Sequence, residues 1–308
     1  MDTSERPALR ALTIGEIFDR AVTFYVRNFV VFTLTVLTLL APAGLAEYFY
    51  TTRSSAELTQ ILSQLQHPGG TPYFPPQFGT LILVALFVLL LAPFCNNAVA
   101  VGVATIYSGH TPSYAGGFRR VLRRWAALFG TTVLCGLILL GIYFALAITL
   151  TIVLFGSVAA TGRVPLFSIP TLVVFVVVVL VAALFFATVF IVCVFALYAT
   201  TIEDDRPGEA IGEGFERIFN RREYPKALLM ALCYVVLQIG ALLISFSLAL
   251  LIVSVLHSDV LQMIVSTLIN AMLTAFGTVL MAVYYYDVRT RAEGLDLEDD
   301  LQRLTAPT

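Results

Sequence analysis

Charge is scarce in this 308-residue sequence. Asp, Glu, Lys and Arg make up 12% of it, whereas soluble globular domains carry about 25%. Hydrophobic residues reach 59%, and the mean hydropathy is +0.90. So few charges cannot cover a water-soluble sphere of this size, which excludes a soluble enzyme, a disordered tail and a nucleic-acid-binding domain. The composition is that of a polytopic membrane protein.

Residues that carry chemistry are also few. The three histidines are isolated, so no metal-ligand spacing exists. Sequence motifs of hydrolases, zinc proteases and nucleotide-binding loops are absent. The acidic runs at 203–205 and 298–300 lack metal-loop spacing, and we interpret them as solvated charge. The cysteines lie in long apolar segments without a CxxC pair, which favours free thiols; they are Cys95, Cys135, Cys193 and Cys233. We therefore expect neither an enzyme nor a bound cofactor.

Six long segments lack charged residues. A helix of roughly 20 residues crosses the hydrocarbon core of a bilayer, and each segment is long enough. The β-branched run Val173–Val181 raises the alternative of a strand, but an open sheet edge cannot face lipid and a barrel needs alternating polar positions. The sequence thus predicts an all-α protein with six transmembrane helices, near 30–50, 79–106, 126–155, 167–200, 227–256 and 260–286.

The basic residues predict the orientation of these helices. All but two of the 18, Arg53 and Arg163, fall in segments on one side of the six spans. The positive-inside rule places that side, and with it both termini, in the cytoplasm. The first apolar segment begins only near residue 30, which does not fit a cleaved signal peptide.

A short motif precedes the first, third and fifth predicted spans. It consists of an aromatic residue, any residue, an arginine and two apolar residues, at 18–22, 118–122 and 215–219. Around each copy, apolar residues recur at helical spacing, as in a helix that lies in the membrane interface. Thr13 and Glu16 form a capping-box pattern, and Pro207 suits the first position of a helix.

These motifs divide the chain into three units. Residues 1–308 are expected to form a single integral membrane domain with a cytoplasmic tail at 287–308. Each unit is a cytoplasmic interfacial amphipathic helix followed by a transmembrane hairpin. The approximate repeats are 13–107, 113–200 and 207–286.

The second cytoplasmic segment is strongly basic. It holds four arginines and no acidic residue between Tyr107 and Trp125. Anionic lipid attracts such segments by about 1 kcal/mol per basic residue. Contact with lipid head groups is therefore one interpretation, and a topology signal alone is the other. The four candidates are Arg119, Arg120, Arg123 and Arg124.

Polar residues deep in a span often mark function. None of those at mid-membrane is charged, which argues against an ion pump or a proton-coupled carrier. Pro42 and Pro93 interrupt the backbone hydrogen bonds of two spans. Side-chain amides near such kinks either line an intramembrane polar cavity or bond neighbouring helices. The candidates are Asn96, Asn97, Gln238 and Asn270.

The two ends of the chain carry the most specific patterns. One is Thr13-Ile-Gly-Glu-Ile-Phe-Asp-Arg20, which continues to Phe29. The other is Tyr285-Tyr-Asp-Val-Arg289, followed by Glu293-Gly-Leu-Asp-Leu297. Together they resemble the bacterial family called the glycerophosphoryl diester phosphodiesterase membrane domain. The resemblance implies a bacterial plasma (inner) membrane and covers the membrane region only, so it carries over no catalytic residue.

The end of the last span has further local signals. Tyr284, Tyr285 and Tyr286 are expected to form an aromatic belt at the membrane surface. Gly294 is expected to end the helix that continues into the cytoplasm.

Three functions follow from these features. We favour a non-catalytic protein that organises the membrane and contacts membrane lipids or other membrane proteins. The alternatives are a small permease or lipid-handling transporter and, on the resemblance alone, an accessory membrane subunit of a glycerophosphodiester phosphodiesterase. No nucleic-acid partner is expected.

Overall fold

The computed structural model describes residues 10–65, 77–161, 169–220, 223–256 and 258–294. Within these ranges the regular structure is entirely helical, which confirms the predicted all-α class. The short helices are α1 (Ile14–Arg27), α4 (Tyr114–Arg123) and α7 (Pro207–Ile218). The long helices are α2 (Phe29–Leu65), α3 (Gln77–Tyr107), α5 (Trp125–Thr161), α6 (Ile169–Ile202), α8 (Tyr224–Leu256) and α9 (Asp259–Glu293).

The long helices are suited to a membrane. Six helices of the described residues are long and apolar enough to cross one, which confirms the multi-pass membrane class. The run Val173–Val181 lies within α6, as the argument against a strand requires. Helix α2 continues to Leu65, beyond the apolar segment predicted at 30–50, because Ala, Leu, Gln and Glu sustain a helix after the hydrophobic run ends.

Local signals fix several helix ends. The hydroxyl of Thr13 accepts a hydrogen bond from the backbone of Glu16, and the Glu16 carboxylate accepts one from the backbone of Thr13, so the capping box is confirmed. Pro207 is the first residue of α7. Gly294 ends α9 with a φ of 65°, a left-handed conformation that glycine adopts without strain, as expected.

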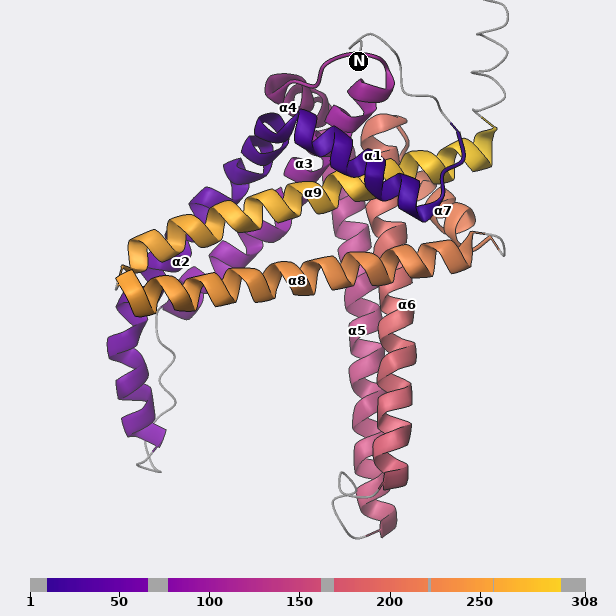
Figure 1. The fold of residues 1–308 in the computed structure, drawn as a ribbon. Coiled ribbons are helices and arrows are strands. Elements are labelled where there is room, and N and C mark those ends of the chain that lie inside the picture. The colour runs from indigo at the N-terminus through magenta and orange to yellow at the C-terminus, as the bar shows by residue number, and fades with distance from the viewer. Residues whose placement is uncertain (1–9, 66–76, 162–168, 221–222, 257, 295–308) are drawn as a thin grey trace, which may run out of the picture.

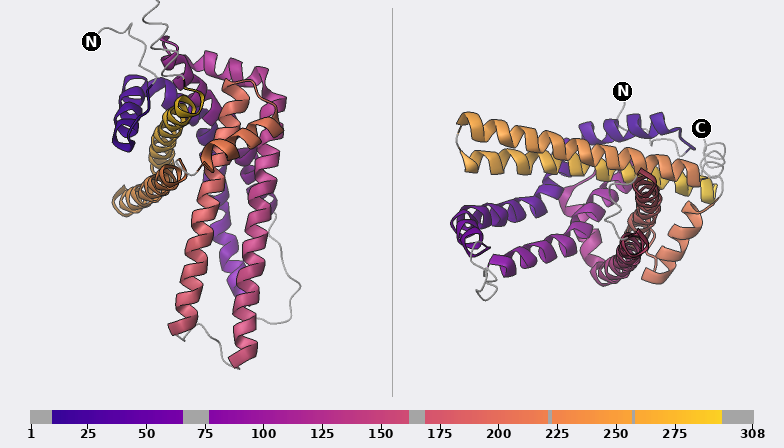
Figure 2. Two further views of the ribbon diagram at one scale, coloured as in Figure 1. Left: turned by 90° about the vertical axis from the view of Figure 1, so that its right-hand side faces the viewer. Right: turned by 90° about the horizontal axis from the view of Figure 1, so that it is seen from below.

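Sequential long helices pack as pairs, α2 with α3, α5 with α6 and α8 with α9. The pairs leave a common end of the molecule, where the three short helices lie, in different directions (Figures 1 and 2). Pair α5–α6 descends in Figure 1, while pair α8–α9 crosses the view. The pairs are therefore not parallel to one another, so in a flat bilayer they cannot all lie along its normal.

Each short helix packs against the last helix of another pair. Helix α4 contacts α3, α7 contacts α6, and α1 contacts α9, so these contacts form a closed ring at the common end. Two equivalent positions are buried in every short helix, the residue just before the motif and the fourth residue of the motif: Ile17 and Ala21, Gly117 and Val121, and Gly214 and Ile218.

Glycine permits the close approach of two of these helices. A Cβ atom at Gly117 would lie 2.8 Å from the carbonyl oxygen of Ala98 on α3. A Cβ atom at Gly214 would lie 3.1 Å from the carbonyl oxygen of Val192 on α6. At Gly117 a side chain would collide with backbone, which cannot rotate away, and at Gly214 the backbone of α6 would have to move by a few tenths of an ångström.

The tyrosines at the end of α9 belong to the core. Tyr284 and Tyr285 are fully buried, and their rings lie 5.3 and 5.1 Å from the ring of Phe195 on α6. Tyr286 stacks on Tyr107 at 4.4 Å. The predicted aromatic belt is therefore wrong. Several helices surround α9, among them α1, α2, α3 and α8, so this segment does not face lipid.

Candidate functional site

The motif arginines of the first two short helices contact the ends of long helices. The guanidinium of Arg20 lies 5.9 Å from the ring centre of Tyr107, the last residue of α3. Arg120 donates hydrogen bonds to the carbonyls of Thr201 and Ile202 at the end of α6, at 3.2 and 3.4 Å. Each arginine thus places positive charge where the helix dipole is negative.

The third motif arginine, Arg217, joins three helices. Its side chain is 12% exposed and donates to Glu203 after α6, Glu213 on α7 and Glu293 on α9, at 3.0, 2.8 and 3.0 Å. Arg217 also donates to the hydroxyl of Tyr285 at 3.3 Å, and that hydroxyl donates to Glu203. All three copies of the motif arginine therefore contact the end of the last long helix in their own repeat.

The Arg217 network shifts the pKa values of its members. Burial raises the pKa of Glu203, but hydrogen bonds from Arg217 and Tyr285 outweigh it and hold that pKa below its ordinary value. Burial lowers the pKa of Arg217, and bonding to Glu203 more than reverses this. Both groups are therefore charged at neutral pH. Burial and the neighbouring carboxylates raise the pKa of Asp205.

The acidic run 203–205 differs in part from the expected solvated charge. Glu203 is 10% exposed and ion-paired, so that interpretation is wrong for Glu203. Asp204 is exposed, as expected, and also accepts from two arginines. The run at 298–300 lies outside the described residues. Glu203, Asp205 and Glu213 offer oxygens within 4.8 Å of one another, a spacing that can hold a cation. Arg217 already supplies the positive charge there.

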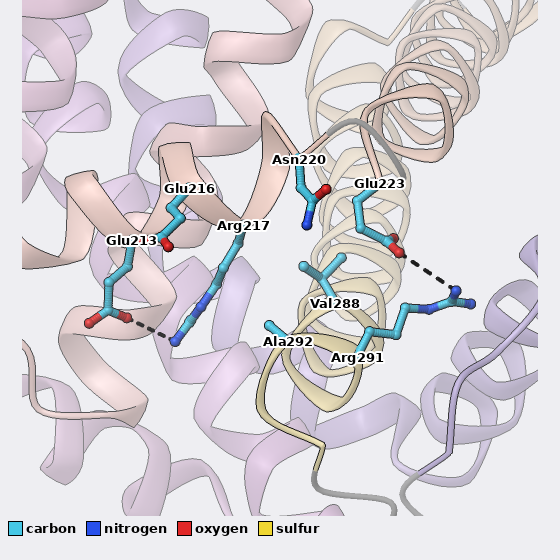
Figure 3. Close-up of a pocket in the computed structure, with 8 residues that line it drawn as sticks. All are labelled: Glu213, Glu216, Arg217, Asn220, Glu223, Val288, Arg291 and Ala292. Atoms are coloured by element: carbon cyan, nitrogen blue, oxygen red, sulfur yellow. Dashed lines mark hydrogen bonds and ion pairs between the residues drawn. The ribbon is translucent and has the colours of Figure 1, made fainter.

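A polar pocket of 780 Å³ lies between α7 and α9 (Figure 3). Two acidic–basic pairs line it, Arg217 with Glu213, and Arg291 with Glu223 at 3.7 Å, and a third carboxylate, Glu216, lines it without a salt bridge to a described residue. The pocket therefore carries charge of both signs, with three acidic and two basic side chains in its lining.

The four arginines of the second segment divide into two pairs. Arg120 and Arg124 donate to the carboxylate of Asp204 at 3.0 and 2.7 Å. Arg124 also donates to the Asp204 carbonyl. Arg119 and Arg123 are exposed, and neither forms a salt bridge with a described residue. One pair is thus committed to the fold, and the other is available at the surface.

A buried ion pair closes the ring between the two ends of the chain. The carboxylate of Asp287 is fully buried and accepts from the backbone of Leu12 at 2.6 Å and from Lys226 at 2.5 Å. Lys226 and Arg291 both donate to the carbonyl of Leu12 at 2.7 Å. Sequence reasoning missed this cluster. Its only local signal is the spacing of Asp287 and Arg291, one helical turn apart.

Two of the predicted amides share a cavity. The junction cavity, of 330 Å³, is bounded by α3, α5, α6, α8 and α9, and both Asn96 and Asn97 line it. Asn96 accepts from Thr278 on α9 at 3.4 Å. Asn97 accepts from Thr201 at 2.7 Å and donates to the carbonyl of Pro93 at 2.8 Å. The amides here both line a space and join helices.

The other two amides lie elsewhere. Gln238 lines the lateral groove, a space of 740 Å³ bounded by α5, α6 and α8. Asn270 is exposed and accepts from Ser245 at 3.0 Å, across the α8–α9 contact. The structure therefore brings Asn96 and Asn97 together, places Gln238 in the neighbouring groove, and sets Asn270 apart.

The described residues define an all-helical integral membrane protein with a charged ring at one end and a cavity among its long helices. Comparisons with protein-family models, with curated proteins and with solved structures find no match. The resemblance of the chain's ends to the glycerophosphoryl diester phosphodiesterase membrane domain stays a prediction.

Proposed function

We propose that this chain is a non-catalytic protein of the bacterial plasma membrane that binds anionic lipid head groups through Arg119 and Arg123. In this proposal three repeats close into a ring at the cytoplasmic face. Each repeat is an interfacial helix followed by a membrane hairpin, and both termini are cytoplasmic. The observation that carries the proposal is that Arg119 and Arg123 are exposed and form no salt bridge with a described residue, whereas Arg120 and Arg124 bind Asp204.

The surface of α4 supports this role. Arg119, Leu122 and Arg123 are three and four residues apart, so they share one helix face. Leu122 is 58% exposed, and Trp125, which follows the helix, is 59% exposed. Exposed apolar side chains beside basic ones are typical of a helix that lies on an anionic membrane surface.

The charge of α4 separates it from the other short helices. Helix α7 carries three glutamates against one arginine, Arg217, which is buried in its own ion pairs. Helix α1 carries Glu16 and Asp19 beside Arg20 and Arg27. Only α4 combines basic residues with no acidic residue, so it is the helix that an anionic surface attracts most strongly.

The chain offers its own reporter for the test. Trp125 is the only tryptophan, and it follows Arg124 directly. In proteoliposomes, brominated phosphatidylglycerol should quench it more than brominated phosphatidylcholine does. Arg119→Gln with Arg123→Gln removes attraction of about 1 kcal/mol per residue, about 2 kcal/mol together, so the preference for the anionic lipid should fall about thirtyfold.

The matched control removes the same charge elsewhere. Arg27→Gln with Arg206→Gln, both exposed residues on other short helices or their ends, should leave the quenching preference unchanged. An unchanged preference in the Arg119/Arg123 variant, or an equal loss in the control, would contradict lipid binding by α4.

A further inference from the structure

We propose that the junction cavity and the lateral groove together bind one uncharged membrane amphiphile. Its hydrogen-bonding head group occupies the junction cavity, and its hydrocarbon tail occupies the groove. This site does not depend on the α4 arginines, which lie on the surface and line neither space.

The two spaces are neighbours. Phe190 on α6 and Tyr234 on α8 line both of them. Their rings stack at 5.9 Å with an interplanar angle of 28°. These two stacked rings therefore lie where the junction cavity meets the lateral groove. A ligand that occupies both spaces must contact both rings.

The polar groups are concentrated in the junction cavity. Asn96, Thr132 and Thr278 line it together with Tyr234. Asn96 accepts from Thr278 through its oxygen, while its side-chain N–H groups have no acceptor among the described residues. These groups are left to bind a hydroxyl, ester or amide oxygen of a ligand.

No charged residue is among the described residues that line either space. An ionised head group would therefore lose its hydration without gaining a counter-charge, which is costly in an apolar environment. A neutral head group loses far less. This excludes a phosphate or carboxylate and favours a neutral polar group.

Along α5, the polar junction cavity and the apolar groove follow each other in the same order as the head group and the tail of a lipid. On α5, Thr132 of the junction cavity lies about 10 Å from the first residue of the helix, and Tyr143 of the groove lies about 27 Å from it. The polar end is thus nearer the ring of short helices, and the apolar end is deeper among the membrane-spanning segments.

The groove is open to the hydrocarbon of the membrane. Its lining is apolar except for two tyrosines and Gln238, and it belongs to segments long and apolar enough to cross a bilayer. A bilayer supplies hydrocarbon tails to such a surface. Both volumes, 330 and 740 Å³, lie in the range of small-molecule sites, about 300–1,000 Å³.

Two glycines of α5 provide a matched test. A Cβ atom at Gly136 or at Gly141 would meet no other atom within 4 Å, so a side chain fits at both. Gly136 lines the junction cavity, and Gly141 lines neither space. Gly136→Leu therefore adds a side chain to the lining of the junction cavity, whereas Gly141→Leu adds the same side chain to the surface outside both spaces.

The probe is a monoacylglycerol with a photoreactive diazirine in its tail, added to the full chain in lipid nanodiscs. Cross-links mapped by mass spectrometry should concentrate on the groove segments of α6 and α8 around Phe190 and Tyr234. Labelling there should fall at least about fivefold in Gly136→Leu and stay unchanged in Gly141→Leu. Thermal unfolding should show that both variants remain folded.

Two further probes test the head group. The matching photoreactive fatty acid, ionised at neutral pH, and a photoreactive alkane without a head group should both label the groove less than the monoacylglycerol. Asn96→Leu should reduce the advantage of the monoacylglycerol over the alkane. Equal labelling by all three probes, or full labelling in Gly136→Leu, would show ordinary lipid contact and overturn the proposal.

Discussion

Asp287→Ala is expected to destabilise the protein by about 3–5 kcal/mol, the usual effect of removing one partner of a buried ion pair. The Lys226 ammonium, with a side chain 14% exposed, would lose its counter-charge. The backbone N–H of Leu12 would lose its acceptor. Unfolding of the purified protein by SDS, followed by circular dichroism, measures the change.

The other variants separate this ion pair from a general charge effect. Asp287→Asn keeps an acceptor for Leu12 and loses only the charge, so its loss should be intermediate. Asp19→Ala removes an exposed carboxylate from α1, and its effect should stay within about 0.5 kcal/mol. If Asp287→Ala lowers the free energy of unfolding no more than Asp19→Ala does, the ion pair does not stabilise the contact between the two ends of the chain.

Arg217→Ala should have the second large effect. Among the described residues it leaves Glu203, which is 10% exposed, with one ion-pair partner, Arg289 at 3.4 Å, beside the hydrogen bond from the hydroxyl of Tyr285. Loss of the central cation in this network should cost about 3 kcal/mol or more at pH 7. Glu213→Ala removes a 41% exposed partner of the same arginine and should cost at most about 1 kcal/mol.

The loss of folding stability in Arg217→Ala should depend on pH. In the folded protein the pKa of Glu203 lies below its ordinary value of 4.5. The ion pair therefore contributes fully above that value, and its contribution is lost as the pH falls through the lowered pKa. The gap in stability between the wild type and Arg217→Ala should narrow in acid. A gap that widens in acid, or a loss at pH 7 no larger than that of Glu213→Ala, would contradict the assigned role.

Local and periodic features were predictable from the sequence. In lipid every backbone polar group must be satisfied within the chain, so each long uncharged segment has one regular solution, a helix. The caps at Thr13 and Gly294 depend on neighbouring residues alone. The short amphipathic segments also had a readable apolar face, and the buried positions Ile17 and Ala21 lie on it.

Pairing between distant residues was not predictable. Leu12 and Asp287 are 275 residues apart, and the sequence gives no reason to join that carboxylate to Lys226 rather than to any nearby arginine. The same holds for Tyr284 and Tyr285, which match a membrane-surface pattern but are enclosed by helices from other repeats. Packing partners, rather than residue type, decided both outcomes.

The sequence identified the four amides as candidates but did not show which of them lie together in the structure. The long helices are apolar on nearly every side, so hydrophobic periodicity does not show which face points inward. Asn96 and Asn97 follow the proline of α3 and reach the junction cavity, whereas Asn270 faces outward from α9. Only the rotation of each helix about its axis separates these cases.

Membrane crossing by all three helix pairs is the central claim, and labelling of a cysteine at Ser258 tests it most directly. Ser258 caps the start of α9 at the connection from α8. In a variant with the four native cysteines replaced by alanine, a membrane-impermeant thiol reagent should modify Ser258→Cys only from outside the cell. Ala115→Cys, on α4, should react only from the cytoplasmic side. Labelling of Ser258→Cys from the cytoplasmic side would show that α8 and α9 do not cross the membrane.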